Sequence, residues 1–267
     1  MIPHIANFYW NRETPLSYLR YLTLVTFRHH HPQWTMRLWT SRSNTAARWG
    51  GPERQDFMAT SETDYMPMVH SLGVDVLNLP EDHGTIAPNY ISDIARWQTI
   101  IGGGWFFDLD QIIVRPFNEL CFADFVTGAG NPGVIYCGVV GASPLSKVPE
   151  IMWRAVTSKI QEGTDSYCEA GNWLLRAMMS TPEFRRDTDQ ERHNTTPSRY
   201  FYPVADSGDV WKIYDGSIII PRGEDNYAMH WFGGHPLSQK FNAIYTEKYA
   251  RTSNDTISRY LRMEGIG

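Results

Sequence analysis

The sequence predicts a single α/β domain with a mainly parallel sheet flanked by helices. Three observations support this fold class. Strand-like apolar segments alternate with helical segments through the first half of the chain, which is the pattern of strand–helix–strand units. A length of 267 residues suits one domain of this class. No repeat, linker or low-complexity tract divides residues 1–267.

The first elements alternate regularly along the chain. Residues Ile2–Trp10 are aromatic and β-prone, and Trp34–Trp39 alternates in polarity, so both predict strands. Between them a helix opens at Pro15 and ends before Pro32, because apolar residues recur there at helical spacing. A polar loop over Ser41–Gly51 follows.

The middle of the chain continues this alternation. Glu53–Leu72 predicts a helix with a break at Pro67, and Val74–Leu79 predicts a third strand. Ile91–Ile101 predicts a helix that is stopped by three consecutive glycines. The apolar run Trp105–Val114 predicts one strong strand.

The second half of the chain is predicted to hold fewer strands. We expect a strand over Gly133–Gly141, helices over Pro149–Gln161 and Asn172–Met179, a polar loop over Thr181–Ser198, a last strand within Trp211–Pro221 that includes Ile218–Ile220, and a helical tail from Lys240 to Arg262.

Composition excludes several classes of protein. The formal net charge is -5 and no strongly basic tract is present, so non-specific binding to nucleic acid is not expected. The three cysteines form no Cys-x-x-Cys pair, which argues against a structural zinc site or a disulfide framework. No apolar run approaches a membrane span and no signal peptide is recognisable. We therefore expect a cytoplasmic protein.

The most apolar stretch of the predicted strand Trp105–Val114 ends in two carboxylates. Asp108 and Asp110 are two residues apart, so on a strand they would point the same way. Burying such groups is unfavourable unless a cation or hydrogen bonds compensate. Carboxylate oxygens suit Mg²⁺ or Mn²⁺, and such an ion could bridge a diphosphate. The alternative is a polar strand end at a turn.

Asp93 and Arg96 lie three residues apart on the helix predicted just upstream. They therefore share a helix face. Taken alone, the pair is better explained as an intrahelical salt bridge than as a functional site.

The order of these residues resembles glycosyltransferase family 32. The pattern is Ser92-Asp93-x-x-Arg96, then glycines, aromatic residues and Asp108-x-Asp110. Family 32 includes a group of mannosyltransferases, and the glucosylating clostridial toxins share the pattern. Weaker matches are the opening Ile2-Pro3-His4-Ile5 through Trp10, the segment His31-Pro32-Gln33-Trp34 through Trp39, and His230-Trp231-Phe232-Gly233-Gly234.

The resemblance implies a GT-A type fold with a nucleotide-sugar-binding sheet. It also implies a metal-dependent, retaining transfer of a hexosyl or pentosyl group from a UDP- or GDP-sugar. The implied sites are a donor-binding set of Tyr9, Trp10, Ser92, Asp93, Arg96, Asp108 and Trp231, a catalytic set of Asp93, Arg96 and Asp108, and a Mn²⁺ or Mg²⁺ site of Asp108, Asp110 and His230. Trp10 would stack on the base, Asp93 and Arg96 would hold the sugar, and Trp231 would lie near the diphosphate.

The sequence departs from the family in its middle strand. The family often carries an asparagine there, whereas this chain has Gly138 near that place. Asn172 is a candidate for the missing amide. No clear match covers residues 160–215, where acceptor-binding segments usually vary. The acceptor therefore stays open among a glycan, a lipid-linked sugar, a protein side chain and a modified nucleobase.

Two other classes remain as alternatives. Phe107-Asp108-Leu109-Asp110 also resembles the start of a haloacid-dehalogenase-type phosphatase with Asp108 as nucleophile, but Gln111 and two isoleucines follow where a hydroxyl side chain is expected. The third class is a nucleotide-sugar-binding protein without turnover. Retention of two costly acids, Asp108 and Asp110, argues against it.

Overall fold

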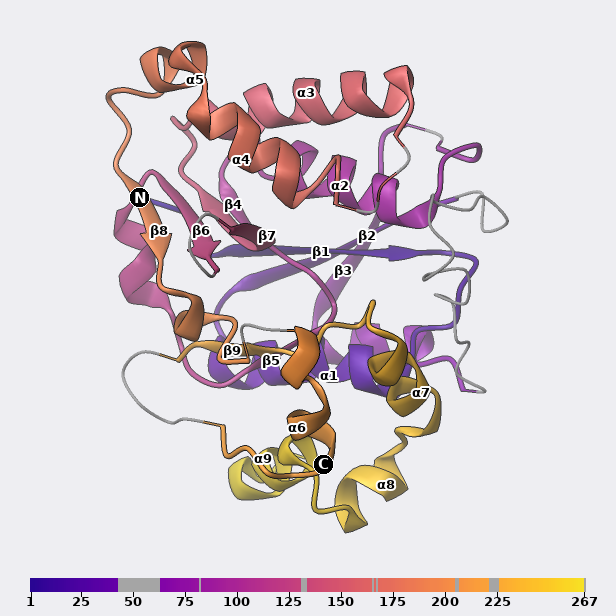
Figure 1. Ribbon diagram of the computed structural model, residues 1–267. Coiled ribbons are helices and arrows are strands. Elements are labelled where there is room, and N and C mark those ends of the chain that lie inside the picture. Colours follow the sequence, from indigo (N-terminus) through magenta and orange to yellow (C-terminus); the bar gives the residue numbers. More distant parts are fainter. Residues whose placement is uncertain are drawn as a thin grey trace.

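A seven-stranded sheet forms the centre of the computed structural model, with the strand order β3-β2-β1-β4-β7-β6-β8 (Figure 1). The structure describes residues 1–42, 63–81, 83–130, 134–164, 166, 168–204, 207–220 and 226–266. Strands β1 to β4 run parallel, β7 is antiparallel to both β4 and β6, and β8 is parallel to β6. The strands of this sheet are β1 (Ile5–Asn11), β2 (Thr35–Ser41), β3 (Val74–Asn78), β4 (Gly104–Phe107), β6 (Phe125–Ala129), β7 (Ile135–Ala142) and β8 (His193–Thr196).

Helices cover both faces of this sheet (Figure 1). One face packs against α2 (Pro88–Gln98), α3 (Val148–Glu162), α4 (Asn172–Ser180) and α5 (Pro182–Asp187). The other face packs against α1 (Tyr18–His30), α6 (Trp211–Tyr214), α7 (Pro236–Ile244), α8 (Glu247–Thr252) and α9 (Thr256–Glu264). This arrangement confirms the predicted class, a mainly parallel sheet flanked by helices. None of the helices among the described residues is long and apolar enough to cross a membrane.

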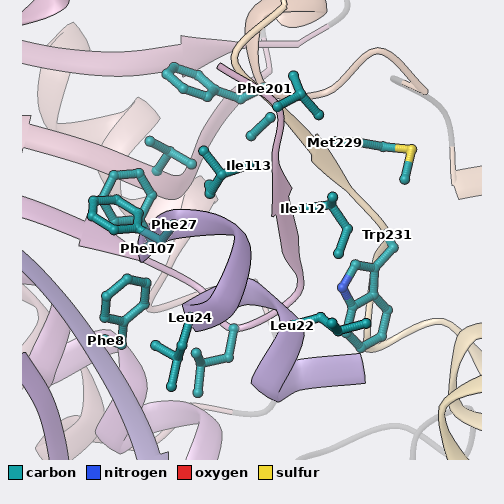
Figure 2. Packing of buried hydrophobic residues seen from close by; sticks show 14 of the residues in the cluster. Phe8, Leu22, Leu24, Phe27, Phe107, Ile112, Ile113, Phe201, Met229 and Trp231 are labelled. Carbon is teal, nitrogen blue, oxygen red and sulfur yellow. The ribbon is translucent and has the colours of Figure 1, made fainter. Parts of the chain in front are cut away.

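Local sequence explains how helix α1 forms and how it is held against the sheet. Ser17 caps its start and accepts a hydrogen bond from the Arg20 backbone N–H, as serine commonly does at this position. Leu22, Leu24 and Phe27 are buried and pack toward the sheet (Figure 2). Each such side chain contributes roughly 1.5–3 kcal/mol when it is fully removed from water. The packing of α1 therefore fixes the position of Arg20 on the same helix.

The predicted strand Trp105–Val114 is split in two. β4 ends at Phe107, and β5 (Gln111–Ile113) leaves the main sheet to pair with β9 (Ala228–His230) in a two-stranded antiparallel sheet. The intervening residues are held by backbone bonds from the Asp108 N–H to the Gly138 carbonyl and from the Trp231 N–H to the Asp110 carbonyl. Asp108 and Asp110 thus stand at a turn, and the strand geometry expected for them was wrong.

The predicted loop Thr181–Ser198 was also wrong. It contains α5, which Thr181 caps through the Phe184 N–H, and the edge strand β8, which pairs with β6. Sequence patterns missed β8 because His193–Thr196 is entirely polar. They also missed β6 (Phe125–Ala129), which is short, and β9, whose partner β5 lies far away along the chain.

The last predicted strand, within Trp211–Pro221, is replaced by α6 and an irregular segment. Ile219 is exposed, and the Ile218 carbonyl accepts hydrogen bonds from the side chains of Thr256 and Arg259 on α9. Side chains of a helix therefore take the place of a strand partner. For the predicted helix Glu53–Leu72, residues 53–62 lie outside the described residues, and Met66–Leu72 forms a 3-10 helix.

Candidate functional site

The candidate site lies at the carboxyl ends of β1 and β4, in the centre of the sheet. The strand order reverses here, because β2 and β3 lie on one side of β1 while β4 and the later strands lie on the other. Open α/β sheets bind ligands at such a reversal. Trp10 lies near the end of β1, and Asp108 directly follows β4.

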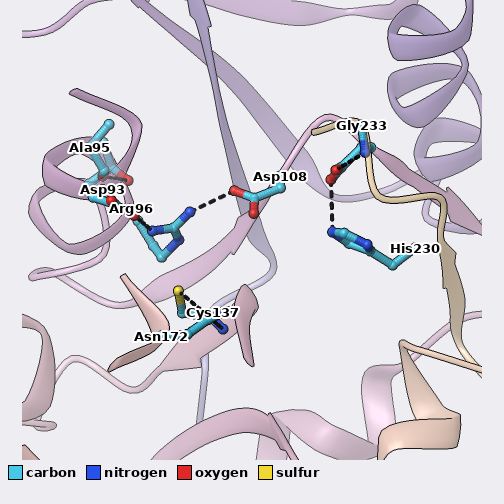
Figure 3. Close-up of polar contacts among 10 residues, drawn as sticks. Asp93, Ala95, Arg96, Asp108, Cys137, Asn172, His230 and Gly233 are labelled. Atoms are coloured by element: carbon cyan, nitrogen blue, oxygen red, sulfur yellow. Dashed lines mark hydrogen bonds and ion pairs between the residues drawn. The ribbon is translucent and has the colours of Figure 1, made fainter. Parts of the chain in front are cut away.

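One half of the site is an ion cluster of the buried residues Asp93 and Arg96 and the partly exposed Asp108 (Figure 3). Asp93 and Arg96 share a face of α2, and the guanidinium forms a hydrogen-bonded ion pair with Asp93. The other end of the guanidinium donates to Asp108 Oδ1 at 2.8 Å. Arg96 is only 4% exposed, whereas the Asp108 side chain retains 27% exposure. The pair expected to be a simple intrahelical bridge therefore extends to the β4 end.

Burial dominates the electrostatics of this half. It raises the pKa of Asp93 to about 6, even though Arg96 opposes the shift. Burial also raises the pKa of Asp108, again against the attraction of Arg96. Keeping the Asp93 carboxylate and the Arg96 guanidinium out of water is rarely a net gain in stability. Such a cluster is therefore better explained by function than by folding.

The second half of the site joins Asp110 to the segment after β9. His230 Nε2 lies 3.1 Å from Asp110 Oδ1, and the Gly233 N–H donates to Asp110 Oδ2 at 2.7 Å (Figure 3). Phe232 has a backbone φ of 51°, and it is the non-glycine residue with a positive φ in the described part of the chain. This uncommon left-handed conformation turns the chain so that the Gly233 N–H meets the carboxylate.

The His230 ring is oriented by the same turn. The Phe232 N–H donates to His230 Nδ1 at 3.1 Å, which assigns the ring proton to Nε2, next to Asp110. Coordination of a cation through Nε2 would require the other tautomer, with the proton on Nδ1 and the Phe232 hydrogen bond given up. Loading of a metal at this ring is therefore coupled to proton movement.

Asp108, Asp110 and His230 together form a candidate metal centre. One ligand atom from each of the three residues lies within 4.8 Å of the others. Two carboxylates suit Mg²⁺ or Mn²⁺, and an imidazole adds affinity for a transition-metal ion. The donor set fits the metal that the sequence pattern implies. The role of each residue as a ligand remains a prediction.

Arg20 is a cation of the site that sequence patterns did not reveal. Its guanidinium carbon lies 4.7 Å from the Trp10 ring centre and 5.3 Å from that of Trp231. Burial disfavours ionisation of Asp110, but His230, Arg20 and the Gly233 N–H outweigh it and hold the pKa of Asp110 at about 2. Only the packing of α1 against the sheet brings this arginine to the site, so no local motif could announce it.

The other predicted donor-binding residues lie around these two halves. Trp10 is half-buried, and its indole N–H donates to the Thr14 carbonyl at 2.7 Å. Tyr9 points to the opposite face of the sheet, where its hydroxyl lies 3.0 Å from Ser41 Oγ. Ser92 is half-buried on α2. Trp231 is fully buried in the core beneath Arg20. Contact of these four residues with a donor remains a prediction.

Asn172 lies beside the ion cluster, at the start of α4. Its Oδ1 accepts the Cys137 N–H at 2.8 Å (Figure 3). The preceding residue, Gly171, approaches so closely that an added Cβ would lie 3.2 Å from Asp93 Oδ1. The structure thus places the proposed substitute amide near Asp93 and Arg96, while its carbonyl oxygen is already used by the backbone of β7.

Gly138, Gln111 and Tyr202 complete the surroundings of Asp108, and the last two were missed by sequence reasoning as site residues. Gln111 stands opposite His230 in the β5–β9 pair, so both side chains lie on the same face. The Tyr202 ring centre lies 5.1 Å from that of His230. Neither polar group makes a hydrogen bond to a described residue. Leaving such buried groups unpaired costs roughly 1–3 kcal/mol each.

Comparison with known proteins supports the fold. Neither a protein-family model nor a curated protein matches the chain, so the resemblance to family 32 stays a prediction. Among solved structures, the glycosyltransferase GlyE of Streptococcus pneumoniae TIGR4 has a TM-score of 0.50 at 10% identity, over 100% of this chain and 64% of GlyE. PaToxG glycosyltransferase has a TM-score of 0.46 at 12% identity, over 71% of this chain and 78% of its own. A glycosyltransferase involved in glycosylation of the PBCV-1 major capsid has a TM-score of 0.45 at 9% identity, over 90% and 99%. At such identities the likeness concerns the fold alone.

Proposed function

We propose that the protein is a metal-dependent glycosyltransferase that moves a sugar from a nucleoside-diphosphate sugar to an acceptor. The observation that carries the proposal is the position of Asp108. Its carboxylate pairs with Arg96 on one side and belongs to the cluster with Asp110 and His230 on the other. One residue thereby connects a polar cluster suited to a sugar with a cluster suited to a metal–diphosphate complex.

The proposed binding of the donor divides along the same line. Trp10, at the end of β1, would stack on the base, since a flat aromatic ring suits that contact. Arg20 lies between Trp10 and Trp231, and its charge would bind the diphosphate. Asp93 and Arg96 would hydrogen-bond hydroxyl groups of the sugar. Each group is positioned by a different element, so binding would fix the donor in one orientation.

The proposed reaction breaks the bond between the anomeric carbon and the leaving phosphate oxygen. A new bond forms from the anomeric carbon to the acceptor oxygen. The acceptor proton passes to the leaving phosphate, which fits a retaining course without a dedicated base. A divalent ion at Asp108, Asp110 and His230 would neutralise the charge that grows on the diphosphate. Arg96 and Arg20 would add fixed positive charge on either side of the breaking bond.

The donor is proposed to be a UDP- or GDP-sugar, and the acceptor is left open. No structural observation favours the phosphatase alternative. Asp108 Oδ1 is engaged by Arg96, and the residue at the position of the expected hydroxyl, Gln111, is fully buried. A binding protein without turnover would use the same contacts, and release of nucleoside diphosphate distinguishes a transferase from it.

Thermal-shift screening tests the proposal. We expect nucleoside diphosphates and nucleotide sugars to raise the melting temperature in the presence of Mn²⁺, and to do so much less in EDTA. A ligand at a hundred times its Kd stabilises by about 2.7 kcal/mol, a shift that is easily measured. Equal shifts with and without Mn²⁺, or no shift with any uridine or guanosine nucleotide, would contradict the proposal.

A further inference from the structure

Polar groups from three separate elements surround Gly138 on β7. A Cβ added to Gly138 would lie 3.0 Å from Asp108 Oδ2, 3.0 Å from the Tyr202 hydroxyl oxygen and 3.5 Å from Gln111 Nε2. We call these four residues the Gly138 cluster. Asp108 belongs to the proposed donor site, whereas nothing in the reaction described above uses Gln111 or Tyr202.

Both unused side chains are buried and unpaired. Gln111 is 0% exposed and Tyr202 is 1% exposed. Within the described part of the chain, neither amide atom of Gln111 nor the hydroxyl of Tyr202 has a hydrogen-bond partner. Buried polar groups in native proteins are almost always paired. Two exceptions side by side, next to a candidate catalytic carboxylate, indicate a partner that a ligand supplies.

The fold holds these groups in place. An added Cβ on Gly128 would lie 2.7 Å from the Tyr202 ring, so glycine is needed there for the ring to fit. The pairing of β6 with β7 shifts register between Thr127 and Gly128, which is how a strand is locally re-aimed. The Tyr202 ring also packs 4.4 Å from that of Tyr136. Tyr202 is thus wedged in one position rather than free to turn away.

Asp108 is the partly exposed side chain of the Gly138 cluster. Its Oδ1 is occupied by Arg96, while Oδ2 faces Gly138, and the side chain is partly exposed. A sugar hydroxyl that donates to Oδ2 would come within reach of an amide and a phenol. A tyrosine hydroxyl carries its proton at neutral pH, so that of Tyr202 can donate.

We infer that Gln111 and Tyr202 bind one hydroxyl group of the donor sugar beside Asp108, and that Gly138 allows these side chains to lie against β7. The inference rests on the proposed function and adds the class of donor. A Cβ at Gly138 would lie only 3.0 Å from the Asp108 and Tyr202 oxygens, so glycine at this position lets both groups approach β7. The donor is therefore a sugar with a free hydroxyl that reaches Asp108, Gln111 and Tyr202.

The test combines two variants with deoxygenated donors. Tyr202→Phe removes only the hydroxyl, and Gln111→Met keeps length while removing the amide. Tyr245→Phe is the matched control, because Tyr245 is equally buried but bonds to Ser258 outside the site. Donor affinity is measured by calorimetry with Mn²⁺ for the parent nucleotide sugar, its monodeoxy analogues and the bare nucleoside diphosphate.

We expect one deoxy analogue to bind wild-type protein about ten-fold more weakly than the parent donor, the loss of one good hydrogen bond. Tyr202→Phe should bind the parent donor about ten-fold more weakly, show no further loss with that analogue, and bind the bare diphosphate normally. Its melting temperature should be unchanged or higher, because the lost hydroxyl had no protein partner. Tyr245→Phe should melt lower and discriminate like wild type.

Two results would overturn the inference. One is Tyr202→Phe and Gln111→Met discriminating among deoxy donors like wild type. The other is a lower melting temperature for Tyr202→Phe without any change in donor affinity, which would make the hydroxyl structural. Failure of wild-type protein to bind either the diphosphate or any nucleotide sugar would instead overturn the proposed function, so the two failures are distinguishable.

Discussion

The two halves of the site place the same residue type in opposite electrostatic states. On the Arg96 side, burial raises the pKa of Asp93 to about 6. On the His230 side, the imidazole, Arg20 and a backbone N–H overcome burial and lower the pKa of Asp110 to about 2. The first half is a dry cluster on a helix, and the second is a carboxylate kept charged at a loop. A half that tolerates a neutral carboxyl suits sugar hydroxyls, whereas a permanently charged carboxylate suits a cation.

The largest effect is expected from a substitution in the second half of the site, at Asp110. Asp110→Asn keeps the side-chain size and can still accept the Gly233 N–H, but it removes the charge. Because a metal contributes several kcal/mol of charge stabilisation, we expect turnover to fall by about a thousand-fold or more. The control is Asp124→Asn, since Asp124 pairs with the exposed Arg192 away from the site. Full activity in EDTA, or in Asp110→Asn, would remove the metal from the account.

The next largest effect is expected from a substitution in the first half of the site, at Asp93. Asp93→Asn should lower kcat by about a hundred-fold, the usual cost of losing one group that stabilises a transition state. Binding of the bare diphosphate with Mn²⁺ should be unchanged, because Asp110 and Arg20 lie on the other side. Turnover and diphosphate affinity are measured on the same preparation. Near-normal turnover would show that Asp93 and Arg96 are only an ion pair of α2.

The same variant sharpens the comparison through stability. The folded pKa of Asp93, about 6, lies above the unfolded value of about 3.9. The folded state therefore holds the proton more tightly than the unfolded state. The stabilisation that Asp93 contributes to the folded state is complete below pH 4, and it is lost as the pH rises toward and through 6. Asparagine mimics the protonated form. As the pH rises from 4 to 7, the melting temperature of Asp93→Asn should increase relative to that of wild type. A structural salt bridge predicts the opposite trend.

A smaller effect is expected at Trp10, which is proposed to stack on the nucleotide base of the donor. Trp10→Ala should raise the donor KM with little change in kcat, because stacking on the base is the same in the ground and transition states. Loss of a base–aromatic contact costs on the order of 1–3 kcal/mol. Steady-state kinetics with the true donor give both constants. A lowered melting temperature with an unchanged KM would place Trp10 in the core instead.

The smallest effect concerns Arg20. Arg20→Gln should weaken binding of the bare diphosphate by about ten-fold, equivalent to one charge-assisted hydrogen bond. The preference for nucleotide sugar over bare diphosphate should not change, because the sugar half is untouched. Arg154→Gln, which removes an exposed arginine on α3, controls for net charge. An altered preference for the sugar would show that Arg20 acts on both halves.

These halves also differ in how far the sequence reveals them. The first lies within residues 93–108, and helix spacing predicts the Asp93–Arg96 pair, but only the family resemblance pointed to a functional role for it. The second joins Asp110 to a residue about 120 positions later, and only the resemblance of the His230 segment to a family element pointed to it. The fold follows the same rule. β1 to β4 and α1 to α4 have local periodicity, whereas β8 and β9 depend on partners that are distant along the chain.

Residues without a motif could not be predicted at all. Arg20 reaches the site because α1 packs under the sheet, and Tyr202 reaches it because Gly128 leaves room for its ring. Nothing in the neighbouring sequence of either residue marks it as functional. The turn over Asp108–Asp110 was hidden for the opposite reason: apolar residues on both sides of it continue a strand pattern that the structure interrupts.

The central claim is that Asp108 joins a sugar-binding half to a diphosphate-binding half, and product identity tests it most directly. Single-turnover incubation with a panel of UDP- and GDP-sugars and Mn²⁺ should release nucleoside diphosphate from one donor. That release should disappear in Asp108→Asn and in EDTA. Release of inorganic phosphate would indicate phosphatase chemistry at Asp108. Tight binding of a nucleotide sugar with no product, even when glycan, protein and nucleobase acceptors are supplied, would contradict the claim that this site transfers a sugar.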